Sequence, residues 1–352
     1  MKKYAVITGA SSGIGKEFAK ILAKEGYALA LTARRGDRLR KMAKHLKTEC
    51  RIVEADLTKE EDCYRLYQSV AELPVAVWIN NAGFGHCGTF KEGELEKELD
   101  MISVNVRAVH LLTKLVLKKM ERQNYGSILN VASCAGLMPA GPYMATYYAT
   151  KSYVTSLTRA IAEELRYEGS PVYVGCLCPG PVNTEFNEVA EVEFALKGIS
   201  PAWCARYGYQ QMKRGKTVIV PKLSVKSAVT LGRFLPEPLY IRIAAHQQAK
   251  KKNGTNTSQK DIFIPPQKIP PLLQRYRLLN PLGVQQVFHI FQETDAFCTV
   301  CHIVEERLAA QGDFRGKQRL LAVLFYFFHG SRIKMLFFFR VERSAGGFQS
   351  FQ

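Results

Sequence analysis

One pair of side chains in the middle of the chain has the types and the spacing of a proton-transferring group. Tyr147 and Lys151 lie four residues apart in a predicted helix, so they share one face of that helix. A free tyrosine has a pKa near ~10 and releases its proton reluctantly at neutral pH. A neighbouring ammonium favours the phenolate and lowers that pKa, which suits a tyrosine that exchanges a proton with a substrate oxygen. A tyrosine that only packs in the core is the alternative interpretation.

A second candidate site lies near the start of the chain, where a glycine-rich run follows the apolar segment Tyr4–Ile7. The run reads Thr8-Gly9-Ala10-Ser11-Ser12-Gly13-Ile14-Gly15. Glycine takes positive φ angles and lets the backbone approach a phosphate without a Cβ in the way. A helix that begins at Ile14 would direct its free N–H groups and its positive end at the anion. The run therefore predicts a phosphate cradle between a first strand and a first helix.

Strand-like and helix-like segments alternate up to about residue 250, and this alternation positions the candidate residues. The expected strands are apolar on both faces, as in a buried parallel sheet: Tyr4–Thr8, Ala28–Ala33, Arg51–Glu54, Val75–Ile79, Ser127–Val131, Val172–Leu177 and Thr217–Val220. The expected helices are Ile14–Glu25, Asp37–Leu46, Lys59–Ala71, Leu95–Arg122, Tyr143–Tyr167 and Pro201–Arg214. The pattern predicts an α/β fold of the Rossmann type, a doubly wound parallel sheet flanked by helices. In such a sheet, ligands bind beyond the carboxyl ends of the strands.

Composition restricts the classes of partner. The 352 residues carry a formal net charge of +18, but basic and acidic residues are interleaved, so we expect a solvated basic surface and no nucleic-acid site. No run of ~20 apolar residues could span a membrane, and Met1-Lys2-Lys3 leaves no room for a signal peptide before the first strand. The 9 cysteines show no disulfide framework. Free thiols and a cytoplasmic location are therefore expected.

The character of the chain changes after Lys252, where polar residues and then paired prolines replace the alternating pattern. We expect one nucleotide-binding domain over residues 1–252 and an extension of unknown role over residues 253–352. Poor order, or a translated read-through or frame error, are alternative interpretations of the extension. Its segment Cys298–His302 matches a c-type haem attachment pattern. We interpret that match as coincidence and expect no metal site.

Five motifs in one order over residues 3–184 resemble those of the classical short-chain dehydrogenase/reductase family. The looser pattern to about residue 250 resembles the branch that includes bacterial proteins related to DltE. The motifs are the glycine run, Asp56-Leu57, Asn80-Asn81-Ala82-Gly83, Tyr147 with Lys151, and Pro179-Gly180-Pro181-Val182-Asn183-Thr184. Taken singly, the Asn-Ala-Gly and Pro-Gly motifs are also common turn formers.

The resemblance implies the residues that bind a nicotinamide dinucleotide. These are Gly9, Ser11, Ser12, Gly13, Ile14 and Gly15 in the first turn, then Asp56, Leu57, Asn81, Ala82, Gly83, Tyr147, Lys151, Pro179, Gly180, Val182 and Thr184. It also implies that Tyr147 is the general acid/base and that Lys151 holds the nicotinamide ribose. Asn105 would match the asparagine whose backbone holds a water in the proton relay.

Ser133 is the residue that the resemblance implies for orienting and polarising the substrate oxygen, although its spacing departs from the family. It lies 14 residues before Tyr147, where the family usually has 13, and Cys134 stands at the usual position. A thiol is a weak hydrogen-bond partner, and the loop Leu137–Met144 has room to absorb one residue. We therefore expect the role to belong to Ser133.

The end of the second expected strand, Leu31-Thr32-Ala33-Arg34-Arg35, bears on the choice of cofactor. An acidic residue there would bind the ribose 2′-hydroxyl of NAD, and this chain has Ala33 instead. The Arg34 guanidinium can pair with a 2′-phosphate through two hydrogen bonds. We expect NADP(H) to be favoured over NAD(H). Solvated, functionally silent arginines are the alternative interpretation.

These observations favour an NADP(H)-dependent oxidoreductase that interconverts a ketone or aldehyde and an alcohol. We expect its substrate to be a hydrophobic small molecule. The segment Glu185–Ile199 and the side chains of Phe84, Tyr143 and Met144 are candidates for covering that substrate. The resemblance implies a homo-oligomer built through the helices over residues 95–122 and 143–167. Two alternatives stay open: a catalytically silent protein that senses NADP(H), and a membrane-surface reductase of a lipid precursor that uses the segment Leu223–Ala249.

Overall fold

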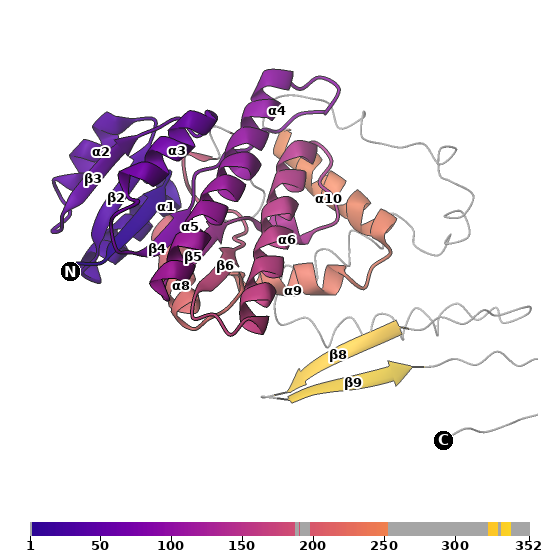
Figure 1. Cartoon of the computed structure of the whole chain (residues 1–352). Helices are drawn as coiled ribbons and strands as arrows, with labels where there is room; N and C mark the ends of the chain where they lie inside the picture. Colours follow the sequence, from indigo (N-terminus) through magenta and orange to yellow (C-terminus); the bar gives the residue numbers. More distant parts are fainter. Residues whose placement is uncertain (1, 187–189, 191–197, 253–322, 330–331, 339–352) are drawn as a thin grey trace, which may run out of the picture. The chain divides into compact units, whose positions relative to one another are not determined.

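The computed structural model describes residues 2–186, 190, 198–252, 323–329 and 332–338 (Figure 1). The chain divides into two units, Met1–Ile262 and Phe263–Gln352, and each is described by itself. In the second unit, β8 (Val323–His329) and β9 (Arg332–Phe338) pair as an antiparallel hairpin. The segment Cys298–His302 lies outside the described residues.

The first unit is built on a seven-stranded sheet with the order β3-β2-β1-β4-β5-β6-β7, in which every neighbouring pair is parallel. The strands are β1 (Tyr4–Thr8), β2 (Ala28–Ala33), β3 (Cys50–Glu54), β4 (Val75–Asn80), β5 (Ser127–Val131), β6 (Tyr173–Leu177) and β7 (Val218–Ile219). Each begins and ends within two residues of its expected range, so the predicted doubly wound α/β fold is confirmed.

Helices connect the strands and cover both faces of the sheet (Figure 1). They are α1 (Gly13–Lys24), α2 (Gly36–Ala43), α3 (Glu60–Ser69), α4 (Leu95–Ile102), α5 (Val109–Gln123), α6 (Ala145–Tyr167), α8 (Pro201–Lys213), α9 (Leu223–Gly232) and α10 (Glu237–Lys252). The helix α8 begins at the expected Pro201, and Ser200 caps it, because the Ser200 hydroxyl accepts a hydrogen bond from the backbone N–H of Trp203 at 3.1 Å.

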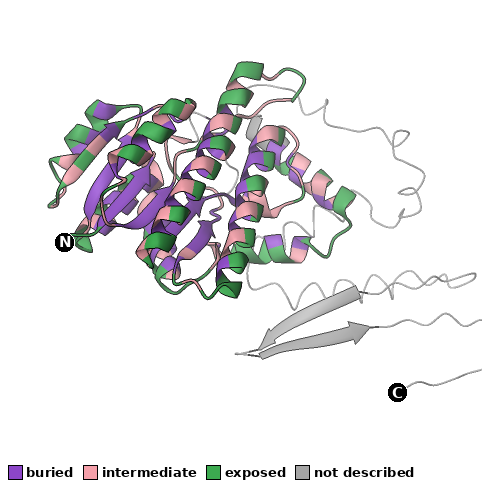
Figure 2. Ribbon diagram, in the orientation of Figure 1, coloured by how far each residue is buried: buried purple, intermediate pink, exposed green. Residues whose placement is uncertain are grey.

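The strands of the sheet are largely buried (Figure 2), and their alternate side chains fill two apolar layers, one on each face of the sheet. On one face Ile7 and Leu31 pack with α1, α2 and α8 through residues such as Phe18, Leu39 and Tyr209. On the other face α3, α5 and α6 pack on the sheet, and their buried side chains are Leu66, Leu112, Val116, Met120 and Leu165. Because both faces of the sheet are buried, every residue along a strand faces an apolar layer, and the strands are therefore continuous apolar runs in the sequence.

A buried polar ladder ties β4 and β5 to the helices in front of them. The Asn80 side chain donates to the Asn130 side chain at 2.9 Å and to the Thr113 hydroxyl at 3.0 Å, and it accepts from the Trp78 indole at 2.7 Å. Asn130 in turn donates to the Thr158 hydroxyl at 3.0 Å. Since all five residues are almost fully buried, these satisfied bonds fix the position of α5 and α6 against the sheet.

The expected single helix over Leu95–Arg122 is interrupted, which corrects the sequence prediction. Between α4 and α5, the residues Ser103–Ala108 form a π-helical segment, η1. This segment contains Asn105. A π-helical turn has more residues than an α-helical turn, and such a short interruption leaves no recognisable mark on the spacing of apolar residues in the sequence. The prediction failed here because the interruption depends on contacts with the loop after β4, which the helix sequence does not contain.

The last two helices of the unit, α9 and α10, occupy the segment Leu223–Ala249 that was a candidate membrane contact. Buried Gln248 on α10 donates from its side-chain nitrogen to the Tyr148 hydroxyl, so α10 packs on α6. Leu223 and Phe234 stay exposed. Within the described residues, no helix is long and apolar enough to cross a bilayer.

Candidate active site

The candidate site lies where the strand order reverses, between β1 and β4. The chain leaves the two strands in the turns that hold Gly9 and Asn81, and direct hydrogen bonds join them. The Asn81 side chain donates to the carbonyls of Thr8 at 2.9 Å and Gly9 at 3.1 Å. The Thr8 hydroxyl accepts from the backbone N–H groups of Asn81 and Ala82, both at 3.0 Å. The switch point of an open α/β sheet is where ligands bind.

The glycines of the first turn are required by both conformation and space. Gly9 has a φ of 64° and Gly13 a φ of 54°, which side-chain-bearing residues rarely adopt. A Cβ on Gly15 would collide with the Asn81 amide and the Gly9 carbonyl. Ser12 precedes α1 without making a side-chain cap, and the first turn of α1 holds no acidic residue. The N–H groups of the α1 N-terminus are therefore left to an anion.

The loop after β6 reaches the same turn. A Cβ on Gly13 would lie 3.1 Å from the Thr184 methyl carbon, so Thr184 lies against the glycine run. Val182 is buried and bridges to Ile199, and the carbonyl of Pro179 accepts from the backbone N–H of Cys134 at 2.8 Å. The loop therefore connects the cofactor side of the sheet with the candidate catalytic residues.

Two predicted cofactor residues have evident structural roles. The Asp56 carboxylate accepts from the backbone N–H of Thr58 at 3.2 Å and from its hydroxyl at 3.0 Å, which closes a turn after β3. Leu57 is buried in the apolar layer beneath α3. Their assignment to the adenine ring remains a prediction.

Arg34 lies exposed just beyond β2, at the same edge of the sheet as the glycine turn. Its neighbours Arg35 and Arg38 make ion pairs with Glu185 at 2.9 Å and 2.7 Å. Three basic side chains therefore follow β2, and Glu185, from the loop after β6, lies among them. The sequence singled out only Arg34 of the three as a ligand, because charge pairing over 147 residues or more is not visible in sequence spacing.

Tyr147 and Ser133 lie close together in the structure, and the roles expected for them in catalysis stay predictions. The Ser133 hydroxyl interacts with the Tyr147 side chain and acts to lower its pKa, and it accepts a hydrogen bond from the backbone N–H of Ala135 at 3.2 Å. Burial raises the pKa of Tyr147, and the interaction with Ser133 opposes that rise. Lys151 is not among the groups that shift the pKa of Tyr147, so the expected lowering by Lys151 is not seen in this structure. The tyrosine is therefore held as the protonated phenol.

The Lys151 Nζ atom lies over the face of the Tyr147 ring, 5.8 Å from the ring centre. It donates to the Val131 carbonyl at 3.1 Å. Burial lowers the pKa of Lys151 to about 8. Gly83 lies against it, because a Cβ there would be 3.2 Å from Nζ and 2.8 Å from the Asn105 side-chain oxygen. The glycine of the predicted Asn-Ala-Gly motif thus makes room for a buried cation.

Asn105 occupies the π-helical segment and is fully buried. Its side-chain oxygen accepts from the Phe84 N–H at 3.1 Å, while its nitrogen donates to the Phe84 carbonyl at 2.9 Å and the Thr150 hydroxyl at 3.1 Å. The side chain therefore anchors the loop after β4 beside α6. Interruptions of this kind frequently occur at functional sites.

An apolar wall surrounds the Tyr147 ring. The buried or partly buried members of this cluster are Phe84, Cys87, Met101, Ala135, Met138, Met144, Tyr148, Phe186 and Ala190. The Phe186 ring lies 5.5 Å from that of Tyr147, centre to centre. Phe84 and Met144 were predicted; Phe186 was not singled out, although it lies within the predicted covering segment. The residues Val189, Val192, Phe194 and Leu196 of that segment lie outside the described residues.

Together, the parallel sheet, the uncapped helix N-terminus at a glycine turn and the tyrosine–lysine pair at the same edge define a dinucleotide-binding α/β protein. A search against protein-family models gives a match to the short chain dehydrogenase family over residues 3–193, more than half of the chain. The chain therefore belongs to the short-chain dehydrogenase family and is by family an oxidoreductase.

Several curated relatives are very-long-chain 3-oxoacyl-CoA reductases. The chain is 33% identical over 202 residues to a very-long-chain 3-oxoacyl-CoA reductase of Anas platyrhynchos, covering 54% of this chain and 63% of the relative. It is 38% identical over 175 residues to one of Kluyveromyces lactis, covering 46% and 50%. The chain thus spans about half to two thirds of their length. The narrower placement beside DltE-related proteins stays a prediction.

Solved structures support the fold and the class of cofactor. A short-chain dehydrogenase from Sphingobium yanoikuyae in complex with NADPH superposes with a TM-score of 0.60 at 28% identity, covering 66% of this chain and 93% of that one. A short-chain dehydrogenase/reductase from Burkholderia phymatum in complex with NAD gives 0.61 at 26%, with the same coverage. A nicotinamide dinucleotide is thus the class of cofactor, and these two structures leave the choice between the phosphorylated and unphosphorylated forms open.

Proposed function

We propose that this protein is an NADP(H)-dependent reductase that interconverts a carbonyl group and an alcohol. The observation that carries the proposal is the contact between Tyr147 and Ser133 above buried Lys151, at the sheet edge that also holds the glycine turn. A proton donor, a hydrogen-bond partner and a cation within one buried cluster are the groups that reduction of a carbonyl requires.

The cofactor fits this edge of the sheet, and the chain's own residues would hold it. The α1 N-terminus and the backbone of Gly9 and Gly13 would receive the pyrophosphate, and Lys151 would bind the ribose hydroxyls. When bound, the reduced nicotinamide supplies a hydride to the carbonyl carbon. Tyr147 then transfers its phenolic proton to the carbonyl oxygen while Ser133 hydrogen-bonds to that oxygen. The Lys151 ammonium, below its pKa of about 8, stabilises the resulting phenolate.

The substrate class is proposed from the apolar wall. A substrate carbonyl that reaches Tyr147 would contact Phe84, Met144 and Phe186, which favour a hydrophobic chain or ring beside the reacting carbon. The names of the curated relatives support a 3-oxoacyl thioester as the first compound to test. We propose a cytoplasmic location. A cytoplasmic enzyme should stay in the supernatant when it is sedimented with liposomes, whereas a membrane-surface reductase of lipid precursors should sediment with them.

The phosphorylated cofactor is proposed because Ala33 offers no carboxylate to a ribose hydroxyl and the exposed Arg34 follows it. NADPH should bind more tightly than NADH, and Arg34→Ala should remove most of that difference. Equal dissociation constants for the two dinucleotides in the unmodified protein would contradict this part of the proposal.

The turnover experiment separates an enzyme from a silent cofactor sensor. The full chain is mixed with NADPH and a panel of ketones, aldehydes and 3-oxoacyl thioesters, and NADPH oxidation is followed. Tyr147→Phe should lower turnover by about 10²-fold or more while NADPH still binds, because only the proton donor is removed. Binding without turnover of any compound, unchanged by Tyr147→Phe, would instead support the sensor.

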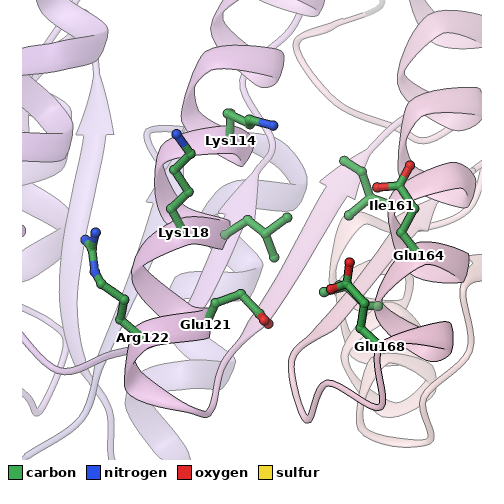
Figure 3. Close-up of a pocket in the computed structure, with 9 residues that line it drawn as sticks. Lys114, Lys118, Glu121, Arg122, Ile161, Glu164 and Glu168 are labelled. Carbon is green, nitrogen blue, oxygen red and sulfur yellow. The ribbon is translucent and has the colours of Figure 1, made fainter.

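We further propose a homo-oligomer built through α5 and α6. Among the described residues, a hollow of about 380 Å³ lies between these helices, and its charged lining residues are Lys114, Lys118, Glu121 and Arg122 on α5, Glu164 on α6 and Glu168 just after α6 (Figure 3). A two-fold axis that sets α5 of one copy against α6 of the other would pair these charges. Light scattering at low and high salt should report a dimer or larger assembly that weakens with salt.

A further inference from the structure

Thr184–Phe186, the described residues at the end of the loop after β6, form a strap that contacts both the glycine turn and the candidate proton donor. At one end, Thr184 lies against Gly13 in the glycine turn. At the other, Phe186 packs on Tyr147, with 5.5 Å between ring centres. The strap therefore touches both the expected pyrophosphate seat and the proton donor.

Glu185, in the middle of the strap, is held by two arginines from another part of the chain. Its carboxylate accepts from Arg35 at 2.9 Å and from Arg38 at 2.7 Å and 3.1 Å. Hydrogen bonds from Arg35 and then Arg38 lower the pKa of Glu185. The three side chains are 39–46% exposed, so the pairs can exchange with a ligand from solvent.

Two guanidinium groups that converge on one carboxylate have the donors that a phosphate also requires. The pair follows β2, and under the proposed function the ribose 2′-substituent of the cofactor lies at the end of that strand. The carboxylate and a 2′-phosphate would therefore compete for the same donors.

We propose that Glu185 is a specificity-determining residue, which occupies Arg35 and Arg38 in the absence of cofactor and yields them, as additional donors beside Arg34, to the 2′-phosphate of NADPH. The proposal rests on the proposed function. The free energy needed to displace Glu185 weakens the binding of NADPH. The affinity for NADH is unaffected, because NADH has no 2′-phosphate that would displace Glu185. Glu185 thus sets how strongly the enzyme prefers the phosphorylated cofactor, and NADPH alone releases the centre of the strap.

The test is calorimetric titration of the full chain with NADPH and with NADH. Glu185→Gln should tighten NADPH binding about 3- to 10-fold, the range expected from exposed ion pairs, and change NADH binding less than about twofold. Glu163→Gln is the matched control, because Glu163 also forms an exposed ion pair, with Arg166, on α6. In an Arg35→Gln/Arg38→Gln background, Glu185→Gln should lose its effect.

Each remaining outcome counts against the proposal. An unchanged ratio of the two affinities shows that Glu185 does not compete with the 2′-phosphate. Weaker binding of both dinucleotides makes Glu185 a clamp over the bound cofactor. A full gain that persists in the double-arginine background assigns the effect to overall charge. Failure of the unmodified chain to bind either dinucleotide overturns the proposed function as well, whereas normal NADPH preference with an unchanged ratio overturns only this inference.

Discussion

Replacing the buried cation Lys151 by methionine should change the pH dependence of stability in a calculable way. Burial lowers the pKa of Lys151 from 10.5 to about 8, so at pH 7 the folded protein pays for a desolvated ammonium that the unfolded chain solvates freely. Each tenfold change in proton affinity is about 1.4 kcal/mol, so the penalty is about 3 kcal/mol at pH 7 and about 1 kcal/mol at pH 9.5.

The sign follows from proton binding in the two states. Between pH 8 and 10.5 the unfolded chain holds more protons at this site than the folded one, so stability rises with pH there and the penalty is complete below pH 8. Lys151→Met removes the penalty. It also leaves the Val131 carbonyl without its donor, a loss that does not depend on pH. The free energy of unfolding of Lys151→Met minus that of the wild type should therefore fall by about 2 kcal/mol between pH 7 and 9.5.

Urea unfolding at four pH values measures this difference, with Lys24→Met as the control. Lys24 is exposed in the last turn of α1, and its removal should give curves parallel to the wild type. Parallel curves for Lys151→Met would contradict this prediction, since they would mean that Lys151 is solvated in the folded protein. Lys151→Met should also lose turnover at every pH. A variant that is more stable at pH 7 but inactive would show that the Lys151 cation serves the chemistry although it destabilises the fold.

Two further changes test the site. Gly15→Ala places a Cβ against the Asn81 amide and the Gly9 carbonyl; it should destabilise the fold by about 1–3 kcal/mol and raise the Kd for NADPH at least tenfold. Gly26→Ala, where an added Cβ has no neighbour within 4 Å but φ is 88°, should cost stability and spare the Kd; equal effects on Kd would argue against a role for the turn in binding. Ser133→Ala should lower kcat/KM about 10²-fold and Cys134→Ala less than about threefold, and the reverse ranking would assign the substrate-orienting role to the thiol.

Local sequence was sufficient for the scaffold, because the information lies in short-range patterns. Apolar runs over Tyr4–Thr8 and Ala28–Ala33 predicted strands that match residue for residue. The expected helix Pro201–Arg214 matches the start of α8, and the four-residue spacing of Tyr147 and Lys151 put both on one face of α6. These features depend on propensity, capping and helix period, which neighbouring residues determine.

Tertiary structure alone decided how the predicted residues act. The break of the 95–122 helix at the segment Ser103–Ala108 depends on the bond of Asn105 to Phe84, in another segment. The low pKa of Lys151 is caused by desolvation, which requires a packed environment.

The ion pairs of Glu185 with Arg35 and Arg38 also depend partly on local sequence and partly on the fold. The sequence determined that basic residues follow the second strand and that a Pro-Gly loop follows the sixth, since both are local signals. Only the fold brings Arg35 within 2.9 Å of Glu185, 150 residues further along. Contacts across such a separation arise from the order in which strands pair in the sheet, and no spacing rule in the sequence contains that order.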